Sequence, residues 1–237
     1  MSQILESSEK NKQLIEEDEV VILPDVDNSE LIARYNLSLV GKIFNKERHN
    51  VEALIALLPR HNIWDVEGRA RGVDLGNHRF QFDFDLEADL LKVLCKCPFH
   101  FNKWLFALER WALHVGESFP NTITFWVCAT GIPTHYWMDP IFRTLGKRLG
   151  LVGKIDAKAA KFQVEINGDQ PLKFSLRAQI PSGEIVPVSF EYVNLFRWCH
   201  NCHLISHEAE NCQKKENKDC WLKKQVGSRV VSLGRKA

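Results

Sequence analysis

Four potential metal ligands within residues 199–212 constrain this chain more than any other feature. They follow the pattern C-x2-C-x4-H-x4-C, formed by Cys199, Cys202, His207 and Cys212. Three soft thiolates and one imidazole can surround a tetrahedral zinc ion, at about 2.3 Å for sulfur and about 2.0 Å for nitrogen. Protein atoms would take all four coordination positions, which is typical of a structural site. The spacing therefore predicts one structural Zn²⁺ in a zinc knuckle.

Two further histidines, His200 and His203, lie inside the same loop and are alternative imidazole ligands. We favour His207 because only this histidine has the four-residue spacing on both sides. The chain has seven cysteines, an odd number, and an acidic N-terminus unlike a secretory leader. Clustered cysteines in such a chain indicate metal binding rather than disulfides. We expect an intracellular location, nuclear or cytoplasmic, and no membrane crossing, because no apolar run reaches the ~18 residues of a membrane span.

Charge is distributed unevenly, although the formal net charge is only +1. Residues 1–30 carry nine acidic and two basic side chains, whereas residues 213–237 carry eight basic and two acidic ones. We expect an acidic, largely disordered segment at 1–34 and a basic disordered tail at 214–237. Basic tails attract phosphate backbones through counterion release. The alternative is a tail that is merely solvated.

Periodicity divides the part between these segments into two α+β units. For residues 35–118 the expected elements are a strand at 37–44, a helix capped by Asn50 and ended by Pro59, a strand within 63–75, a strand at 79–84, a helix at 86–97 and a strand at 103–111. This βαββαβ order predicts a ferredoxin-like domain with the topology of RNA-recognition motifs. Residues 119–196 predict a second, mostly antiparallel α+β unit, in which Asp139 caps a helix that ends at Gly150. The zinc knuckle occupies 197–213.

The strand at 79–84 determines what the first sheet can bind. Phe80, Phe82 and Phe84 alternate with polar residues. If Phe84 faces the core, the apolar residues of the following helix also face the sheet, so we predict that all three rings are buried. The outward face of this strand then lacks the aromatic side chains on which RNA bases stack. A one-residue shift would instead expose three phenylalanines.

Short stretches across the chain, together with the knuckle, resemble a known family. They are Leu39-Val40-Gly41-Lys42, Asn77-His78-Arg79-Phe80, Cys97-Pro98-Phe99-His100-Phe101, Leu108-Glu109-Arg110-Trp111, Phe125-Trp126-Val127 and Gly131-Ile132-Pro133. In this order they resemble the plant domain of unknown function found in first-open-reading-frame proteins of LINE-type retroelements and in their host-genome copies. The resemblance implies an RNA-recognition-like fold, binding of single-stranded nucleic acid, zinc held by the four knuckle ligands, and no catalytic activity.

The sequence predicts a nucleic-acid-binding protein rather than an enzyme. Phosphate-loop, nucleophile-elbow, zinc-protease and deaminase motifs are all missing. We expect single-stranded nucleic acid, RNA in preference to DNA, to contact Trp198, His200, Lys214, Lys215, Trp221, Lys223 and Lys224. The alternative for Trp198 is packing against the preceding sheet. The alternative for the whole chain is a protein-assembly module, including self-association, in which the knuckle is only a structural staple.

Overall fold

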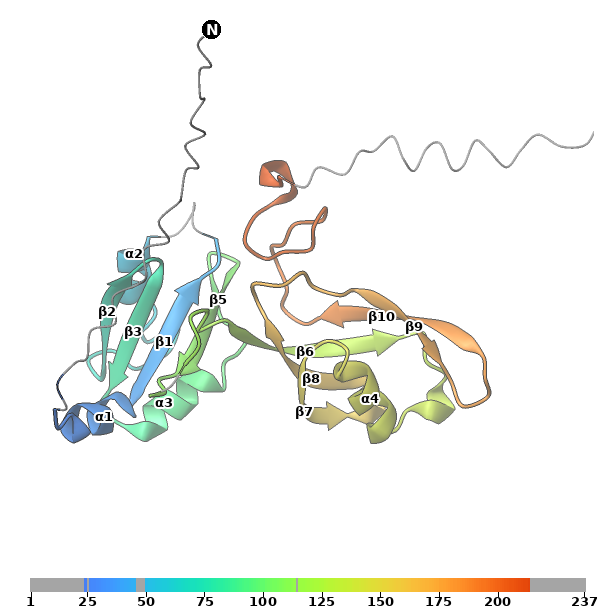
Figure 1. Cartoon of the computed structure of the whole chain (residues 1–237), viewed down its shortest axis with the longest axis horizontal. Coiled ribbons are helices and arrows are strands. Elements are labelled where there is room, and N and C mark those ends of the chain that lie inside the picture. Colours follow the sequence, from blue (N-terminus) through green and yellow to red (C-terminus); the bar gives the residue numbers. More distant parts are fainter. Residues whose placement is uncertain (1–23, 25, 46–49, 114, 214–237) are drawn as a thin grey trace, which may run out of the picture.

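The computed structural model describes residues 24, 26–45, 50–113 and 115–213. These residues form two five-stranded antiparallel sheets that lie side by side, with the knuckle above their junction (Figure 1). The architecture is therefore α+β, as the sequence predicts. Among the described residues, no helix is long and apolar enough to cross a lipid bilayer.

The first sheet has the strand order β2-β3-β1-β5-β4. Its elements are β1 (Ser38–Ile43), α2 (Val51–Leu57), β2 (Ala70–Gly76), β3 (Arg79–Phe84), α3 (Glu87–Leu94), β4 (His100–Phe101) and β5 (Trp104–Arg110). The chain order βαββαβ, with β3 and β5 flanking β1, is the ferredoxin-like arrangement of RNA-recognition motifs. The prediction for this region is confirmed. The sequence did not reveal β4, a two-residue strand paired with β5.

Local interactions explain why these elements form where the sequence places them. The side chain of Asn50 accepts hydrogen bonds from the backbone N–H groups of Glu52 and Ala53, so it caps α2 as predicted. Asn77 and His78 both have positive φ, which produces the tight turn between β2 and β3. Gly41 on β1 leaves space for the ring of Phe80, which a Cβ atom at this position would meet.

The core of the first sheet confirms the predicted register of β3. Phe80 and Phe82 are completely buried and Phe84 is 3% exposed. They pack with Leu90 and Val93 of α3 and with Leu54 of α2 in one apolar cluster. The helices therefore cover one face of this sheet, and the polar residues of β3 point to the other face.

Helix α1 (Ser29–Tyr35) lies at the end of the segment 1–34, for which the sequence predicted no helix. It has no buried residue, but the ring of Tyr35 lies 5.4 Å from the ring of Trp111, between centroids. The guanidinium of Arg110 also donates hydrogen bonds to the carbonyl oxygen of Asn36, directly after the helix. Contacts with distant residues thus hold a helix that has no apolar periodicity of its own. The acidic residues 1–23 lie outside the described part of the chain.

The second sheet has the strand order β7-β8-β6-β10-β9. Its elements are β6 (Thr122–Thr130), α4 (Asp139–Gly146), β7 (Leu151–Asp156), β8 (Lys161–Asn167), β9 (Ser175–Gln179) and β10 (Ile185–Tyr192), with short 3-10 turns η1 (Thr134–Tyr136) and η2 (Ala157–Ala159). Strands β7-β8-β6-β10 repeat the order β2-β3-β1-β5. Helix α4 takes the place of α2, but no helix among the described residues takes the place of α3.

Two details of the second sheet differ from expectation. Strand β7 was not predicted, because its residues do not alternate between buried and exposed positions. Helix α4 begins at Asp139 with Met138 in the capping position, and no side chain caps it. Asp139 therefore lies in the first turn, where a negative charge favours the helix dipole, and the predicted cap is wrong. The helix also ends at Gly146 rather than at Gly150.

Strand β5 belongs to the first sheet but contributes side chains to the cores of both units. Phe106 and Leu108 point into the core of the first sheet, whereas Leu105 and Ala107 belong to the core of the second. One carboxylate oxygen of Glu109 accepts hydrogen bonds from the backbone N–H groups of Asn121 and Thr122, at the start of β6. Alternate residues of one strand thus stabilise both units, and Glu109 ties the end of β5 to the start of β6.

Candidate metal centre

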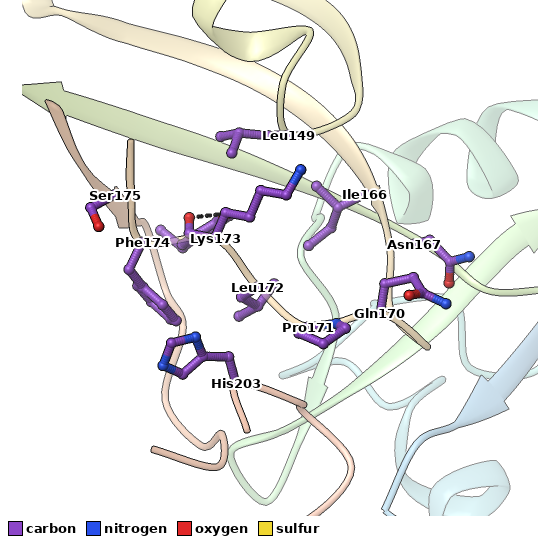
Figure 2. Close-up of a pocket in the computed structure, with 11 residues that line it drawn as sticks. Leu149, Ile166, Asn167, Gln170, Pro171, Leu172, Lys173, Phe174, Ser175 and His203 are labelled. Carbon is purple, nitrogen blue, oxygen red and sulfur yellow. Dashed lines mark hydrogen bonds between the residues drawn. The ribbon is translucent and has the colours of Figure 1, made fainter. Parts of the chain in front are cut away.

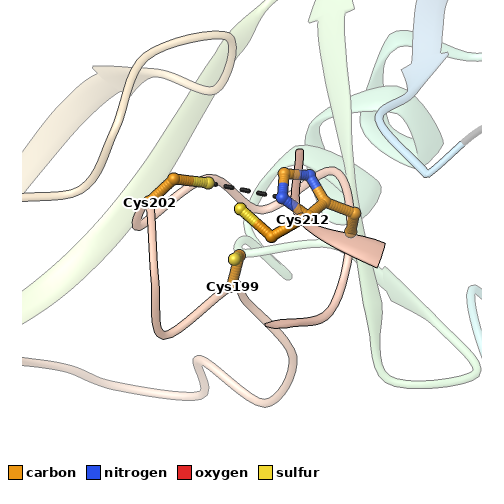
Figure 3. Close-up of side chains that lie close together, drawn as sticks. Cys199, Cys202 and Cys212 are labelled. Carbon is orange, nitrogen blue, oxygen red and sulfur yellow. Dashed lines mark hydrogen bonds between the residues drawn. The ribbon is translucent and has the colours of Figure 1, made fainter. Parts of the chain in front are cut away.

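The four predicted ligands lie together in the structure. The Sγ atoms of Cys199, Cys202 and Cys212 and one ring nitrogen of His207 are all within 4.8 Å of one another (Figure 3). Around a tetrahedral zinc ion, the bond lengths place sulfur and nitrogen ligands about 3.6 Å apart. The Sγ atom of Cys202 lies 3.3 Å from Nε2 of His207, close to that separation. The cluster could therefore hold one zinc ion.

The backbone of the knuckle brings the first two thiols to the same side. The N–H group of His203 donates to the carbonyl oxygen of Cys199 at 2.8 Å, and the N–H group of Cys199 donates to the carbonyl oxygen of Leu204 at 2.7 Å. His203 has φ of 63°, the left-handed conformation that closes this turn. The 3-10 turn η3 (Ala209–Asn211) then places Cys212 beside them. The loop is thus shaped by hydrogen bonds that depend little on side-chain identity.

Ser206 orients the imidazole ligand from outside the cluster. Its hydroxyl oxygen lies 3.0 Å from Nδ1 of His207, while Nε2 faces the thiols. When Nε2 binds a metal, the proton resides on Nδ1 and can be donated to Ser206. This serine directly precedes the histidine in the sequence, so the ligand and the group that orients it lie in the same turn.

The thiols of the cluster differ in acidity. Burial opposes ionisation of Cys199, but hydrogen bonds from the backbone N–H groups of Cys202 and Asn201 and from the thiols of Cys202 and Cys212 together lower the pKa of Cys199. Burial raises the pKa of Cys202 to about 11. The thiol of Cys199 therefore ionises more readily than the thiol of Cys202, whose charged form burial disfavours. A bound divalent cation removes this difference, since coordinating thiols are deprotonated.

The knuckle is packed against the sheets rather than attached by a linker. Ile205, between the second and third ligands, is fully buried in the core of the second sheet. The carbonyl oxygen of His203 accepts a hydrogen bond from the N–H group of Leu172 at 2.9 Å. Arg197 pairs with Glu208 inside the knuckle and lies over the ring of Trp104 in the first sheet. The knuckle therefore contacts both units at their junction.

The aromatic residues next to the cluster pack mainly on one another. Trp198 stacks on Phe174 of the second unit with ring centroids 4.3 Å apart, and its ring centroid lies 4.1 Å from that of His200. Trp198 is half-buried and His200 is exposed. The packing alternative for Trp198 is therefore present in the structure, and His200 is the more accessible of the two predicted contacts. Neither His200 nor His203 belongs to the metal cluster.

Comparisons with known proteins agree with this organisation. Residues 31–117 match a domain of unknown function, DUF4283, and residues 166–214 match a zinc knuckle. This chain contains a DUF4283 domain and a zinc knuckle. An uncharacterized protein of Arabidopsis thaliana is 27% identical over 139 residues, which cover 55% of this chain and 44% of the relative. The match thus spans less than half of that relative's length.

One solved structure shows a distant similarity. A chain of an Sxl-lethal protein/RNA complex matches with a TM-score of 0.29 and 16% sequence identity. The match covers 66% of this chain and 98% of that chain. At this TM-score we draw no conclusion from it. The ferredoxin-like arrangement of the DUF4283 domain rests on its own strand order.

The outer face of the DUF4283 sheet is occupied by internal contacts. Asp83 accepts hydrogen bonds from the hydroxyl of Ser38 and the amide of Gln81, and Ser38 is completely buried. Arg79 donates to the carbonyl oxygen of Glu117, in the segment that connects the two sheets. Lys42 pairs with Asp169 of the second unit at 2.8 Å. The polar residues that were expected to point outward are therefore largely engaged within the protein.

The two units differ in how many of their basic side chains form ion pairs. Eight basic side chains form no ion pair within the described residues, and all but one are exposed: Arg143, Lys147, Arg148, Lys154, Lys158, Lys161, Lys173 and Arg177. In the first unit, five basic residues form ion pairs with carboxylates, while Arg60, Arg79, Lys96 and Lys103 form none within the described residues. Sequence reasoning missed this difference, because which cations form ion pairs depends on the fold and not on their positions along the chain.

Five of the predicted nucleic-acid contacts follow the knuckle in the sequence. Lys214, Lys215, Trp221, Lys223 and Lys224 lie outside the described residues. The described part of the knuckle ends at Gln213, directly after the last ligand. The basic residues therefore follow the metal cluster in the sequence, and their role stays a prediction.

Proposed function

We propose that this chain is a non-catalytic, zinc-dependent protein that binds single-stranded nucleic acid, RNA in preference to DNA. The observation that carries the proposal is the four-ligand cluster, docked on a unit whose eight cations lack ion-pair partners in the described structure. Zinc would be held by Cys199, Cys202, His207 and Cys212 and would have a structural role, because the protein fills all four coordination positions.

The charge pattern supports a phosphate-rich ligand. Cations without carboxylate partners are free to displace the counterions of a nucleic acid backbone. Lys214, Lys215, Lys223 and Lys224 would extend this surface beyond the knuckle. His200 and Trp198 would offer ring surfaces for base stacking, with His200 as the exposed side. A nuclear or cytoplasmic location suits a chain whose six described cysteines are all free thiols.

The experiment compares the full chain with a Cys199→Ser/Cys202→Ser variant. Fluorescence anisotropy measures binding of a labelled 12-nucleotide single-stranded RNA and of the matching DNA across a salt titration, and native mass spectrometry counts bound zinc. The matched control is Cys95→Ser/Cys128→Ser, which removes two thiols outside the cluster. We expect one zinc and salt-sensitive binding in the wild type and the control, and loss of both in the cluster variant. One zinc without binding, even at low salt, would refute the proposal.

Self-association is a second candidate that one observation favours. Strand β2 lies at an edge of the first sheet, and its Val73 and Leu75 are each about half exposed. An edge strand with exposed apolar side chains is a template for pairing with another chain. Light scattering coupled to size-exclusion chromatography tests this. A dimer that becomes a monomer in Val73→Lys would support pairing through β2, whereas a monomer at all concentrations would exclude it.

A further inference from the structure

The second sheet lacks one of the two helices that cover the first sheet. Helix α2 packs on β2 and β3, and α4 packs on β7 and β8 in the same way. The part of the second sheet that a counterpart of α3 would cover is instead approached by residues 170–174 and by the knuckle. Leu172 and Ile205 fill some of this space and are buried in the core. A segment and a knuckle loop fill the space less completely than a helix.

A cavity of about 650 Å³ remains at this place (Figure 2). Its apolar surface comes from Leu149, Ile166 and Leu172, and the aromatic rings of Phe174, Tyr192 and His203 contribute to its wall. Figure 2 shows Phe174 and His203 side by side at one end, with Asn167 and Gln170 at the other. Ligand sites in proteins commonly have volumes of about 300–1,000 Å³, with apolar walls and a few polar groups. The cavity is large enough for one nucleotide.

The rim of the cavity favours a negative charge. None of the described residues that line it is acidic, and Lys173 is exposed at its edge. The ammonium group of Lys173 donates to the carbonyl oxygen of Arg148 at 2.9 Å, which leaves two of its three N–H groups for a ligand. Lys147 and Arg148 directly precede Leu149, a lining residue. An anion at this rim would therefore meet cations and no described lining carboxylate.

Resting on the proposed function, we infer that this cavity takes one unpaired nucleotide of a bound single strand. The rings of Phe174 and His203 stand at 81° to each other, so the planar base would stack on one of them and meet the other with its edge. The amide side chains of Asn167 and Gln170 would hydrogen-bond its edge, and Lys173 would contact the adjoining phosphate. This set of groups matches a base joined to a phosphate.

The cavity also depends on the metal cluster. His203 follows the ligand Cys202, and its carbonyl oxygen is hydrogen-bonded to the N–H group of Leu172 on the cavity floor. The ring of His203 packs against Phe174, with centroids 5.2 Å apart. A knuckle without its metal would no longer hold this wall in place. Nucleotide capture and zinc binding are therefore linked through one loop.

The experiment maps where a bound strand lies. A fluorescent 12-nucleotide RNA with a single 4-thiouridine, and its DNA counterpart with 4-thiothymidine, are bound to the full zinc-loaded chain and photo-crosslinked. Peptide mass spectrometry locates the adducts.

In parallel, anisotropy measures the affinity of the RNA for three variants. Leu149→Trp fills the cavity, Lys173→Gln removes the charge at its rim, and Lys103→Gln is the third. The last variant removes an exposed positive charge from the first sheet and serves as the matched control. Native mass spectrometry and circular dichroism check zinc content and folding.

We expect adducts within residues 166–175 or at His203. Affinity should fall about tenfold in Leu149→Trp, the loss of one stacked base. It should fall about threefold in Lys173→Gln and remain within twofold of wild type in Lys103→Gln. Zinc-dependent binding with adducts elsewhere, and with Lys173→Gln equal to Lys103→Gln, overturns the cavity assignment and leaves the proposed function standing. No binding of either strand overturns both. Because Lys173 is exposed, its variant remains informative if Leu149→Trp does not fold.

Discussion

The two sheets of this protein share a strand order but are completed in different ways. The first is closed by two helices over an aromatic core, and most of the polar groups on its outer face are bound internally. The second has one helix, and the space of the missing helix is shared by a short segment, a knuckle and a cavity. The polar groups of the first sheet are thus largely used within the protein, whereas the cavity and the cations without ion pairs in the described residues belong to the second unit.

The comparison shows that topology alone does not assign a binding surface. RNA-recognition motifs use the outer face of the sheet, with aromatic side chains on the central strands. Here Phe80 and Phe82 on β3 point inward, and Leu105 and Ala107 on β5 pack into the neighbouring unit. Although the first unit has the strand order of an RNA-recognition motif, the outer face of its sheet lacks exposed aromatic rings on β3 and packs against the second unit at β5. The candidate binding surfaces are therefore those of the knuckle and the second unit.

The largest expected effect comes from removing the metal. Cys199→Ser/Cys202→Ser should destabilise the second unit by several kcal/mol, because structural zinc contributes about 10–16 kcal/mol of apparent binding free energy in zinc-finger peptides. Hydrogen exchange should show loss of protection in β8 and β10, while β1 and β3 stay protected. Cys95→Ser/Cys128→Ser serves as the control. Equal loss of protection in both sheets would mean that the units do not differ in their dependence on the knuckle.

Phe82→Ala should have the next largest effect, in the opposite unit. Truncating a fully buried phenylalanine costs about 3–5 kcal/mol through lost burial and the resulting cavity. Chemical denaturation should report this loss of stability, and native mass spectrometry should still find one zinc. If zinc binding were lost as well, the first core would support the knuckle directly, and the proposed division between the units would be wrong.

Glu109 tests the connection between the units. Glu109→Ala leaves the backbone N–H groups of Asn121 and Thr122 without their carboxylate acceptor, which should cost about 1–3 kcal/mol. Glu109→Gln keeps an amide oxygen at the same place and should lose less. Denaturation of both variants measures the difference. If both variants were as stable as the wild type, the hydrogen bonds of Glu109 would not contribute to joining β5 and β6.

Removing two positive charges should weaken RNA binding more in the second unit than in the first. Arg143→Gln/Lys147→Gln should weaken binding of single-stranded RNA about three- to tenfold. It should also reduce the slope of log affinity against log salt by about 1.4, since each phosphate contact of a single strand contributes about 0.7. Arg60→Gln/Lys103→Gln removes the same charge from exposed positions of the first unit and should change the affinity little. Equal losses in the two variants would indicate attraction to net charge rather than to the second unit.

The smallest expected effect is a change in the pH dependence of stability at acid pH, which arises in the first unit. Hydrogen bonds from Lys92 and His61 lower the pKa of Asp65 from 3.8 to about 2. Because the folded pKa is depressed, the stabilisation is present above pH 3.8 and is lost as the pH falls through 2. Asp65→Asn should flatten the pH dependence of stability in this window, by a small amount since Asp65 is solvent-exposed. NMR titration of the Asp65 carboxyl carbon measures the pKa directly, and a value near 3.8 would contradict this ion-pair network.

Sequence patterns predicted the features that depend on neighbouring residues. The cap of α2 by Asn50 and the burial of Phe80 and Phe82 follow from local spacing, and both are present. The grouping of the four metal ligands follows from spacing in the same way. Each is determined within fewer than twenty residues, so one sequence suffices to anticipate it.

The features that the sequence did not reveal depend on residues far apart in the chain. Helix α1 buries no side chain and is held through Tyr35 and Trp111. The docking of the knuckle combines Trp104, Leu172 and Ile205 from separate elements. The cavity exists because a helix is missing from a repeated topology, and a missing element leaves no pattern to recognise. Predicting such features requires knowing how distant segments of the chain are placed relative to one another.

Ile205 shows that this knuckle is not an interchangeable module. It lies between two metal ligands, yet its side chain is completely buried in the core of the second sheet. A knuckle transplanted from another protein would bring the right ligands and the wrong filling for that space unless it carried a similar apolar residue at the same position. Protein engineers who wish to exchange the knuckle should therefore move Ile205 with the ligands, or repack the sheet beneath it.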